Sequence, residues 1–396
     1  MKPRSAALLV LFLVTARAAA DTKIELYTMG PGEDVFESFG HGALCVTDEQ
    51  FPNGACYNYG TTDFRDPPAL IWRFLRGGAT FWVSRMPLPL MLQIYSEGDR
   101  TIYRQVIPLT NEVAVGLAAA LESDSRPENK FYLYNHYLDN CTTRLRDHLD
   151  AATGGKLSAA TEVPTGQTWR DVTLRGFALD IRLLIGMEFL VGRPVDTRMT
   201  LWDAMFLPDV LRAEVQKRLN ADVELVNVRK EPLPTTAPLA GRWLVFAIAG
   251  GLTVLVALAA ILGRPRFWRF ALGLSGLLLG VVGLVVYGAA VVATMIELRR
   301  NEVLLVCLPT DLLLVVLRRR ALWVYLLARV VLLGAVTVGV ALGLLIQPMA
   351  AALAFAAGPL CVAAVRELQN ARRTPVADEP IAEQGLLGPA EGPRLP

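Results

Sequence analysis

Hydrophobic positions are spread unevenly along the 396-residue chain, and their distribution divides it into segments. Residues 1–20 begin with Lys2 and Arg4, continue with an apolar run at 6–14, and end in small residues at 18–20. This order of charged, apolar and small residues is typical of a secretory signal peptide, with cleavage after Ala20. The alternative is an uncleaved anchor, but the apolar core is short for a membrane span.

Residues 21–240 are mixed in polarity, and long apolar runs begin at Gly241. These runs cover about 243–262, 270–293, 303–317, 321–344 and 349–366. A span needs about 20 residues, so the third run, which contains Pro309 and Asp311, either crosses or re-enters. The pattern predicts a signal peptide at 1–20, an exported domain at 21–235 and a membrane domain of about five helices at 236–370. The proline-rich stretch 232–240 is a predicted linker, and the tail at 371–396 is predicted to be disordered.

The arginines favour one orientation of the five runs. Three arginines lie between the first two runs, at 263–269, and should face the cytoplasm if the preceding domain is exported. If the third run crosses, the triple arginine at 318–320 and the basic segment 366–373 also face the cytoplasm. If it re-enters, the triple arginine faces outside, and Arg299 and Arg300 lie outside in either case. We favour five spans and a cytoplasmic tail.

Composition narrows the class of protein further. Hydrophobic residues make up 53% of the chain and charged residues 19%, whereas soluble domains carry about 25% charged residues. This composition excludes a disordered or fibrous chain. The net charge of +2 gives no basis for a nucleic-acid partner.

Three of the five cysteines lie in the predicted exported domain. An oxidising compartment permits disulfides, and Cys45 and Cys56 could pair across adjacent strands. That pairing would leave Cys141 as an odd, potentially reactive thiol. The sequence has no CxxC motif or histidine cluster, so we expect neither a metal site nor a cofactor.

The first segment with candidate chemistry surrounds His41. Alternation over 41–47 predicts a strand that His41 opens between two glycines, and a second strand follows at 55–59, ended by Gly60. Glycines on both sides of a histidine let backbone or substrate approach it closely. The alternative is a structural histidine with satisfied hydrogen bonds.

The second such segment surrounds Cys141. Leu138, Leu145 and Leu149 share one helical stripe, and Asp139 or Asn140 is a suitable N-cap for a helix that runs to about residue 152. Cys141 would then lie in the first turn. There the helix dipole favours a thiolate, and free N–H groups could stabilise an oxyanion. The alternative is a buried structural cysteine.

Together the two segments suggest a cysteine nucleophile with a histidine base. In this hypothesis Cys141 attacks, His41 accepts its proton, and Asn58 orients the imidazole, with the tyrosines on either side of Asn58 as competitors. His136 is an alternative base. A strand histidine, a strand polar residue and then a helix cysteine is the order expected of a circularly permuted papain-like fold, of the α+β class. The reversed chain order is no objection, because triads are defined by geometry.

Four motifs in this region carry a family resemblance. They are Ser38-Phe39-Gly40-His41, Tyr57-Asn58-Tyr59-Gly60-Thr61, Gly98-Asp99-Arg100 with Tyr103-Arg104-Gln105, and Asp139-Asn140-Cys141-Thr142-Thr143-Arg144. Over about residues 22–190 the chain resembles the Lnb-type N-terminal periplasmic domain family. The Asn-Cys pair is also similar to the permuted NlpC/P60 and lecithin:retinol acyltransferase-like group.

The resemblance implies an acyltransferase of the bacterial inner membrane with its N-terminal domain in the periplasm. It implies that Cys141 takes a fatty acyl chain from a phospholipid as a thioester, and that the N-terminal amine of a lipoprotein then receives it, with His41 acting as base and acid. The expected partners are therefore a phospholipid donor, a lipoprotein acceptor and the bilayer. We expect Arg144, Tyr59 and Asn140 to contact substrate.

Two other functions remain open at this point. The same Cys/His pair could serve a cell-wall endopeptidase or amidase, although such a hydrolase needs only a membrane tether. Alternatively, the protein is a non-catalytic, membrane-anchored binding module in which Cys141 is structural.

Several residues could contact lipid directly. Residues 81–83, near Arg76 and Arg85, form either an interfacial patch or an ordinary core strand. Six arginines could bind lipid phosphate, and Arg144 is the strongest candidate because it lies one turn after Cys141. These arginines are Arg73, Arg76, Arg100, Arg104, Arg144 and Arg146.

Overall fold

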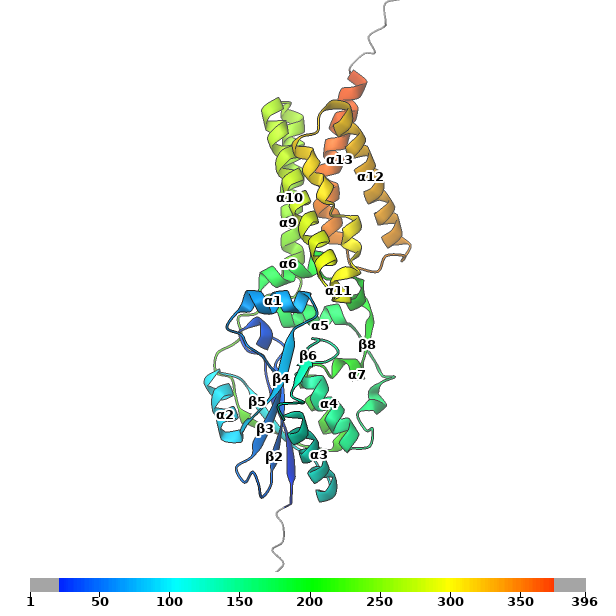
Figure 1. The fold of residues 1–396 in the computed structure, drawn as a ribbon. Helices are drawn as coiled ribbons and strands as arrows, with labels where there is room; N and C mark the ends of the chain where they lie inside the picture. Colours follow the sequence, from blue (N-terminus) through cyan, green and yellow to red (C-terminus); the bar gives the residue numbers. More distant parts are fainter. Residues whose placement is uncertain (1–20, 374–396) are drawn as a thin grey trace, which may run out of the picture.

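A seven-stranded antiparallel sheet organises the first half of the computed structural model, which describes residues 21–373 (Figure 1). Its strand order is β6-β4-β3-β2-β1-β5-β9. The strands are β1 (Lys23–Met29), β2 (His41–Thr47), β3 (Ala55–Thr61), β4 (Thr80–Pro87), β5 (Ile102–Val106), β6 (Phe131–Leu133) and β9 (Val223–Asn227). The predicted strand at 41–47 is confirmed, and the strand predicted at 55–59 extends to Thr61. The predicted signal peptide and the chain beyond residue 373 lie outside the described residues.

Helices cover both faces of this sheet. Helix α2 (Leu88–Glu97) packs on one face, where Ala43, Cys45 and Cys56 are buried. Helices α3 (Asn111–Asp124), α4 (Cys141–Ala152) and α8 (Pro208–Leu219) pack on the other, where Leu26 and Leu44 are buried. Successive side chains of a strand point to opposite faces, so alternate residues of β2 enter different cores. The predicted α+β domain is confirmed to the extent that helices pack on an antiparallel sheet.

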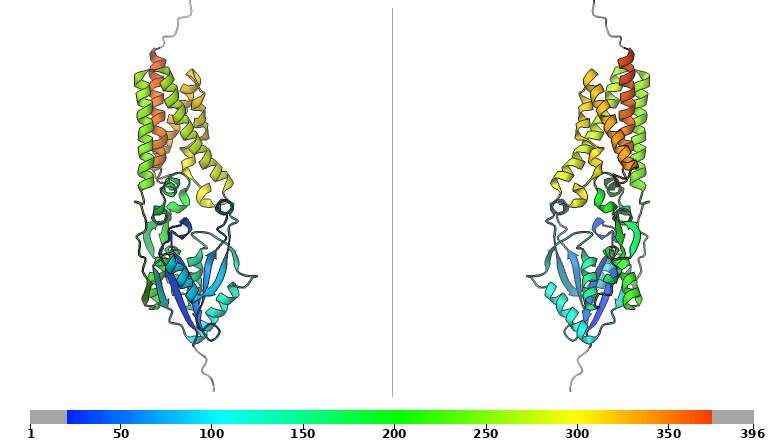
Figure 2. Two further views of the ribbon diagram at one scale, coloured as in Figure 1. Left: turned by 90° about the vertical axis from the view of Figure 1, so that its left-hand side faces the viewer. Right: turned by 90° about the vertical axis from the view of Figure 1, so that its right-hand side faces the viewer.

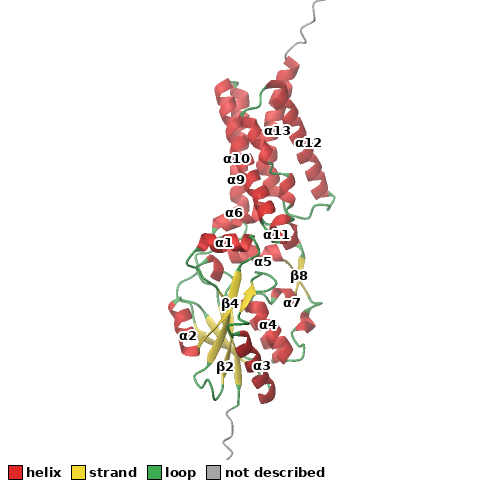
Figure 3. Ribbon diagram, viewed as in Figure 1, coloured by secondary structure: helices red, strands yellow, loops and turns green. Residues whose placement is uncertain are grey.

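Shorter elements form the end of this domain that faces the helical bundle (Figure 3). They are α1 (Pro67–Leu75), α5 (Trp169–Gly176), α6 (Ile181–Phe189), α7 (Leu201–Ala204) and a small sheet of β7 (Pro164–Thr168) and β8 (Arg198–Thr200). Phe81 and Val83 of β4 are buried in the main core. The segment 81–83 is therefore a core strand, and the alternative of an interfacial patch is wrong.

The second half of the described chain is helical. Within residues 21–373, four helices are long and apolar enough to cross a membrane. They are α9 (Ala240–Leu262), α10 (Pro265–Val292), α12 (Arg319–Ala341) and α13 (Ala350–Arg373), and they correspond to the first, second, fourth and fifth predicted runs. The short helix α11 (Ile296–Arg299) lies next to the α/β domain (Figure 1).

The third predicted run is not a fifth α-helix. Residues 303–317 instead form two 3-10 helices, η5 (Glu302–Leu305) and η6 (Pro309–Val315). Pro309 has no backbone N–H and cannot continue an α-helix from the preceding turn, so the chain starts a new element there. The predicted count of about five membrane helices is corrected to four within the described residues.

This segment runs antiparallel along α10, in a groove made by glycines. Gly283 faces Leu308, and Gly276, two turns earlier in α10, faces Leu314. A Cβ on Gly276, Gly280 or Gly283 would lie within 2.5–2.6 Å of the segment, a distance that real Cβ atoms do not tolerate. Small residues permit this close approach of two backbones, as they do at other helix interfaces in membranes.

A buried ion pair anchors the same segment. Asp311 is 0% exposed and Arg329 of α12 is 2% exposed, and the Arg329 Nε and Nη2 atoms donate to the two Asp311 oxygens at 2.8 Å each. The Tyr325 hydroxyl donates to Asp311 at 2.7 Å, and Arg329 also donates to the carbonyl of Val306. The polar residue that made the third run a doubtful span is therefore paired inside the bundle.

The α/β domain and the bundle are joined by hydrogen bonds as well as by the chain. The Asn301 amide donates to the carbonyl of Phe189 at 2.7 Å, and the Thr294 N–H donates to the carbonyl of Leu75 at 2.8 Å. Arg242 at the start of α9 pairs with the buried Glu188 of α6. These contacts hold α1 and α6 against the bundle (Figure 2).

We expect Asp311→Asn to destabilise the bundle by about 3–5 kcal/mol, because it leaves the Arg329 charge buried without its counter-ion. Thermal unfolding in detergent micelles measures the effect. Tyr325→Phe, which removes one hydrogen bond and keeps the ion pair, is the matched control and should cost about 1 kcal/mol. Equal midpoints for wild type and Asp311→Asn would contradict a structural role of the pair.

Candidate active site

Cys141 is the first residue of α4, and a capping box fixes the start of that helix. The Asn140 side-chain oxygen accepts from the N–H groups of Thr142 and Thr143 at 2.9 Å each, and the Thr143 hydroxyl oxygen accepts from the Asn140 N–H. Such reciprocal bonds satisfy N–H groups that the first turn leaves free. The predictions of an Asn140 cap and of Cys141 in the first turn are confirmed.

His41 and Cys141 line the same small cavity, of about 60 Å³. Gly60 lies between the two elements that carry them: its φ is +87°, and a Cβ there would be 3.2 Å from the Cys141 Cβ. Gly42, on the strand that His41 opens, lies close to helix α4, since a Cβ there would be 2.8 Å from the Leu145 Cδ1. Glycines therefore allow the start of α4 to approach the ends of β2 and β3.

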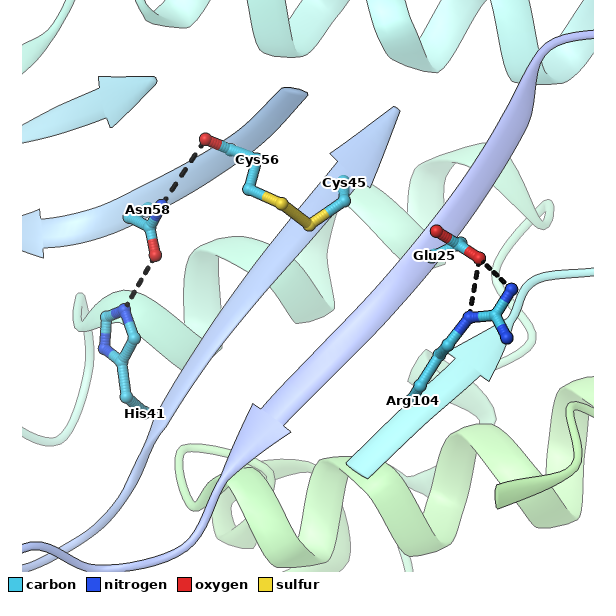
Figure 4. The surroundings of a disulfide bond; sticks show 6 residues. All are labelled: Glu25, His41, Cys45, Cys56, Asn58 and Arg104. Carbon is cyan, nitrogen blue, oxygen red and sulfur yellow. Dashed lines mark hydrogen bonds and ion pairs between the residues drawn. A yellow bond between two sulfur atoms is a disulfide. The ribbon is translucent and has the colours of Figure 1, made fainter. Parts of the chain in front are cut away.

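Asn58 lies beside His41 on the neighbouring strand (Figure 4). The His41 Nε2 and Asn58 Oδ1 atoms are 3.4 Å apart, and the Asn58 Nδ2 donates to the carbonyl of Cys56. Because an amide oxygen can only accept, this contact requires the proton on Nε2 and leaves Nδ1 as the basic nitrogen. The structure thus brings Asn58 to the imidazole, as the sequence predicted for an orienting residue.

A disulfide between Cys45 and Cys56 crosses from β2 to β3 close to this pair (Figure 4). The two cysteines are directly opposite in the strand register, so the suggested pairing across adjacent strands is confirmed. The cross-link joins the strand that His41 opens to the strand that carries Asn58. Cys141 is left as a free thiol.

Burial sets the protonation of both candidate catalytic groups. Burial, and then the charge of Arg100, lowers the pKa of His41 to about 4, against the opposing effect of the Asn58 hydrogen bond. Burial raises the pKa of the Cys141 thiol, although Thr142, Gly42 and Arg100 act in the opposite direction. The expected thiolate is therefore wrong for the unliganded protein, because desolvation outweighs the helix terminus. The pair is a neutral thiol beside a neutral imidazole.

Two of the three predicted substrate contacts lie elsewhere. The Arg144 guanidinium donates to Asp139 at 2.6 and 2.8 Å, and the Tyr59 hydroxyl is 2.8 Å from both Asp124 and His148. Neither Arg144 nor Tyr59 borders the cavity with Cys141. Tyr59 faces the α3 and α4 side of the sheet because it is adjacent to Asn58 on the strand.

Asn140, the third predicted substrate contact, does border the cavity. Its side chain is already occupied, because its oxygen caps α4 and its Nδ2 donates to the carbonyls of His136 and Phe206 at 3.0 Å each. Asn140 therefore positions Cys141.

His136 borders the same cavity and is fully buried among aromatic rings. Its ring centroid is 4.4 Å from that of Phe39 and 5.6 Å from that of Phe206, and its Nε2 has no hydrogen-bond partner. Burial lowers the pKa of His136 to about 4. The structure therefore brings both candidate histidines to Cys141, but only His41 has an orienting side-chain partner.

Beyond His41 the cavity continues into a larger space of about 240 Å³, which Asn58, Tyr95 and Arg100 also line. Phe36 and Phe64 line both parts, and they are 43% and 49% exposed. No motif marked these two rings in the sequence, because Phe36 lies in a three-residue 3-10 helix and Phe64 in irregular chain, where hydrophobic periodicity gives no signal.

This end of the sheet faces the helical bundle. His41 opens β2 and pairs with Met29, the last residue of β1. This end of the two strands points toward the bundle (Figure 1). Helix α1 lies between this end and the bundle, and it exposes Ile71 and Trp72. The candidate site is therefore on the bundle side of the α/β domain, among exposed apolar residues.

Within residues 21–373, no group of three or more His, Cys, Asp or Glu side chains is placed to hold a metal ion.

Comparison with known proteins supports the resemblance found in the motifs. Residues 15–175 match the family model of the Lnb N-terminal periplasmic domain. No curated protein and no solved structure matches the chain. A periplasmic domain family and four helices capable of spanning a membrane fit a protein of the inner membrane. Residues 15–175 are thus similar to the Lnb N-terminal periplasmic domain, and four helices long and apolar enough to cross a membrane follow within the described residues.

Proposed function

We propose that the protein is a membrane-anchored cysteine acyltransferase that moves a fatty acyl chain from a phospholipid to the N-terminal amine of a lipoprotein. The observation that carries this proposal is the shared cavity of Cys141 and His41 at the bundle-facing end of the domain. We also propose that the α/β domain is a permuted papain-like fold. The order of strand histidine, strand asparagine and helix cysteine supports it.

In the first step, the Cys141 sulfur attacks the ester carbonyl of the phospholipid. His41 Nδ1 accepts the thiol proton as the S–C bond forms, since a neutral thiol must lose its proton to become a strong nucleophile. When the C–O bond to glycerol breaks, the imidazolium returns that proton to the glycerol oxygen. A lysophospholipid leaves, and the acyl chain remains as a thioester on Cys141.

In the second step, the α-amine of the lipoprotein attacks the thioester carbonyl. His41 removes a proton from the attacking nitrogen as the N–C bond forms, and it returns this proton to sulfur as the C–S bond breaks. The products are the amide and the free thiol. Asn58 holds the imidazole in one orientation throughout both steps.

The position of the site favours a lipid donor over a cell-wall substrate. Phe36 and Phe64 place exposed apolar surface on the cavity itself, and Ile71 and Trp72 extend it on α1. Tryptophan is enriched at the membrane–water interface, so Trp72 is suited to that zone. A cell-wall hydrolase would gain little from this surface, or from four long apolar helices where one tether suffices.

We expect wild-type protein incubated with phospholipid in detergent to gain one hydroxylamine-labile fatty-acyl mass, because a thioester forms on Cys141. Intact-mass spectrometry measures the adduct. Cys141→Ser should abolish it, and Cys361→Ser, which removes an exposed thiol outside the site, should retain it.

Failure of this experiment separates the alternatives. No adduct together with a Cys141 that resists alkylation would support a binding module. No adduct with a reactive Cys141 would point to peptidoglycan fragments as substrates instead.

We expect kcat/KM for thioester formation to be flat near neutral pH and to fall below about pH 5, with a midpoint near the His41 pKa of about 4. The sign follows because His41 must be neutral to accept a proton, and it becomes protonated as pH falls through its pKa. His41→Ala should reduce kcat/KM by about 10²–10⁴-fold.

Asn58→Ala should cost less than His41→Ala and should shift the acidic limb to lower pH, because the Asn58 hydrogen bond raises the His41 pKa. Ser84→Ala is the matched control, since Ser84 borders the same cavity but bonds to Thr61. An acidic limb that stays in place in Asn58→Ala would place the base elsewhere.

A further inference from the structure

Arg100 is a buried cation with an incomplete set of partners, and it borders the cavity that contains His41. The residue is 2% exposed. Its Nε donates to the carbonyl of Gly30 at 2.7 Å, and its Nη1 is 3.4 Å from a carboxylate oxygen of Glu37. Its Nη2 is buried and has no hydrogen-bond partner. A guanidinium removed from water normally has all its donors satisfied, so this one lacks an acceptor.

Three of the other arginines that the sequence suggested for lipid phosphate pair with carboxylates instead. Arg104 pairs with Glu25 and Glu224, which places it at the outer part of the sheet (Figure 4 shows the pair with Glu25). Arg144 and Arg146 pair with Asp139 and Asp147. Arg100 differs from them because it is deeply buried, its nearest carboxylate oxygen, on Glu37, is 3.4 Å away, and it lines the cavity that contains His41.

Arg100 is also connected to the catalytic pair through an aromatic ring. Its guanidinium carbon lies 5.2 Å from the centre of the Tyr95 ring, and that ring stacks on His41 with centroids 5.7 Å apart. Tyr95, His41 and Arg100 line the same 240 Å³ of the cavity. An anion bound to Arg100 would therefore lie close to His41.

We propose that this part of the cavity is a phosphate subsite, in which Arg100 binds the phosphodiester of the acyl donor and so places the donor's ester carbonyl near Cys141. This inference rests on the proposed acyltransferase function and specifies its substrate as an anionic-phosphate lipid.

The surroundings of the subsite favour a phospholipid over free phosphate. Phe36 and Phe64 line the same space as Arg100 and are partly exposed. A buried cation next to exposed aromatic surface matches a molecule with a phosphate and apolar chains. Glu37, the only carboxylate that Arg100 meets within salt-bridge distance among the described residues, is exposed enough to move away when phosphate enters.

The first test compares two acyl donors with identical chains, phosphatidylglycerol and diacylglycerol, by the rate of thioester formation. We expect wild type to prefer phosphatidylglycerol. In Arg100→Gln the ratio of kcat/KM for the two donors should fall by about 10–100-fold, the effect of losing a charged hydrogen bond. Arg100→Lys should give an intermediate ratio, and Arg182→Gln, an exposed arginine outside the cavity, should keep the wild-type ratio.

A ratio unchanged in Arg100→Gln would overturn the subsite. Equal losses for both donors, accompanied by a lower unfolding midpoint, would show instead that Arg100 only holds the chain near Gly30 and Glu37. Either result leaves the thioester itself, and so the proposed function, standing.

The second test needs no acyl transfer. Cys141 is alkylated with iodoacetamide in the presence of a diether analogue of phosphatidylglycerol, which cannot donate an acyl chain, or of inorganic phosphate. We expect the diether lipid to protect Cys141 of the wild type from alkylation. In Arg100→Gln, the lipid concentration needed for half-maximal protection should rise at least about tenfold. Protection by inorganic phosphate at equal concentration would assign the site to free phosphate.

This second test also separates the two proposals. Arg100-dependent protection in a protein that forms no thioester would retain the lipid phosphate subsite and reject the acyltransferase. No protection of wild type by the diether lipid would reject the subsite.

Discussion

The candidate site depends on one close approach, that of the start of α4 to the ends of β2 and β3. A helix packed on a sheet normally stands off by the thickness of its side chains, yet here Cys141 reaches Gly60, where a Cβ would be 3.2 Å from its own. Gly42 makes a second close contact, with Leu145 on the same helix. Without these glycines, side chains would separate Cys141 from His41. The capping box then fixes which residue of α4 occupies that point, because Asn140 holds the first turn in place.

Local features of this arrangement were predictable from the sequence. Alternation at 41–47, the Asn140 cap and the leucine stripe after it are short-range signals, and each gave an element that the structure contains. The partners of each strand across the sheet were harder to identify, because pairing involves residues far apart in the chain. Arg144 and Tyr59 illustrate the limit: both are near Cys141 or Asn58 in sequence, but strand alternation and a strong ion pair with Asp139 direct them away from the cavity.

Two further differences between the sequence predictions and the structure, the protonation of Cys141 and the form of the third apolar run, depend on tertiary packing. A helix N-terminus favours a thiolate, and sequence reasoning can recognise that position, but it cannot measure the desolvation that raises the Cys141 pKa. The third apolar run poses the same problem in the bundle. Pro309 and Asp311 marked it as unusual, but the glycines of α10 and the distant Arg329 decide that it packs as 3-10 turns. Contacts between segments far apart in the chain determine both outcomes.

A neutral thiol and a neutral imidazole suit the buried surroundings of Cys141 and His41. A thiolate–imidazolium pair would carry a large desolvation cost in a buried cavity. A neutral thiol and imidazole avoid that cost until the thiol proton is transferred. The same low polarity strengthens the electrostatic attraction between a fixed cation and an anion. Arg100, which lacks one hydrogen-bond acceptor, would therefore attract an anion more strongly here than in water. Under the proposed function, the hydrophobic walls would hold the apolar chains of the donor, and the buried Arg100 would fix its phosphate and, through it, the position of the ester.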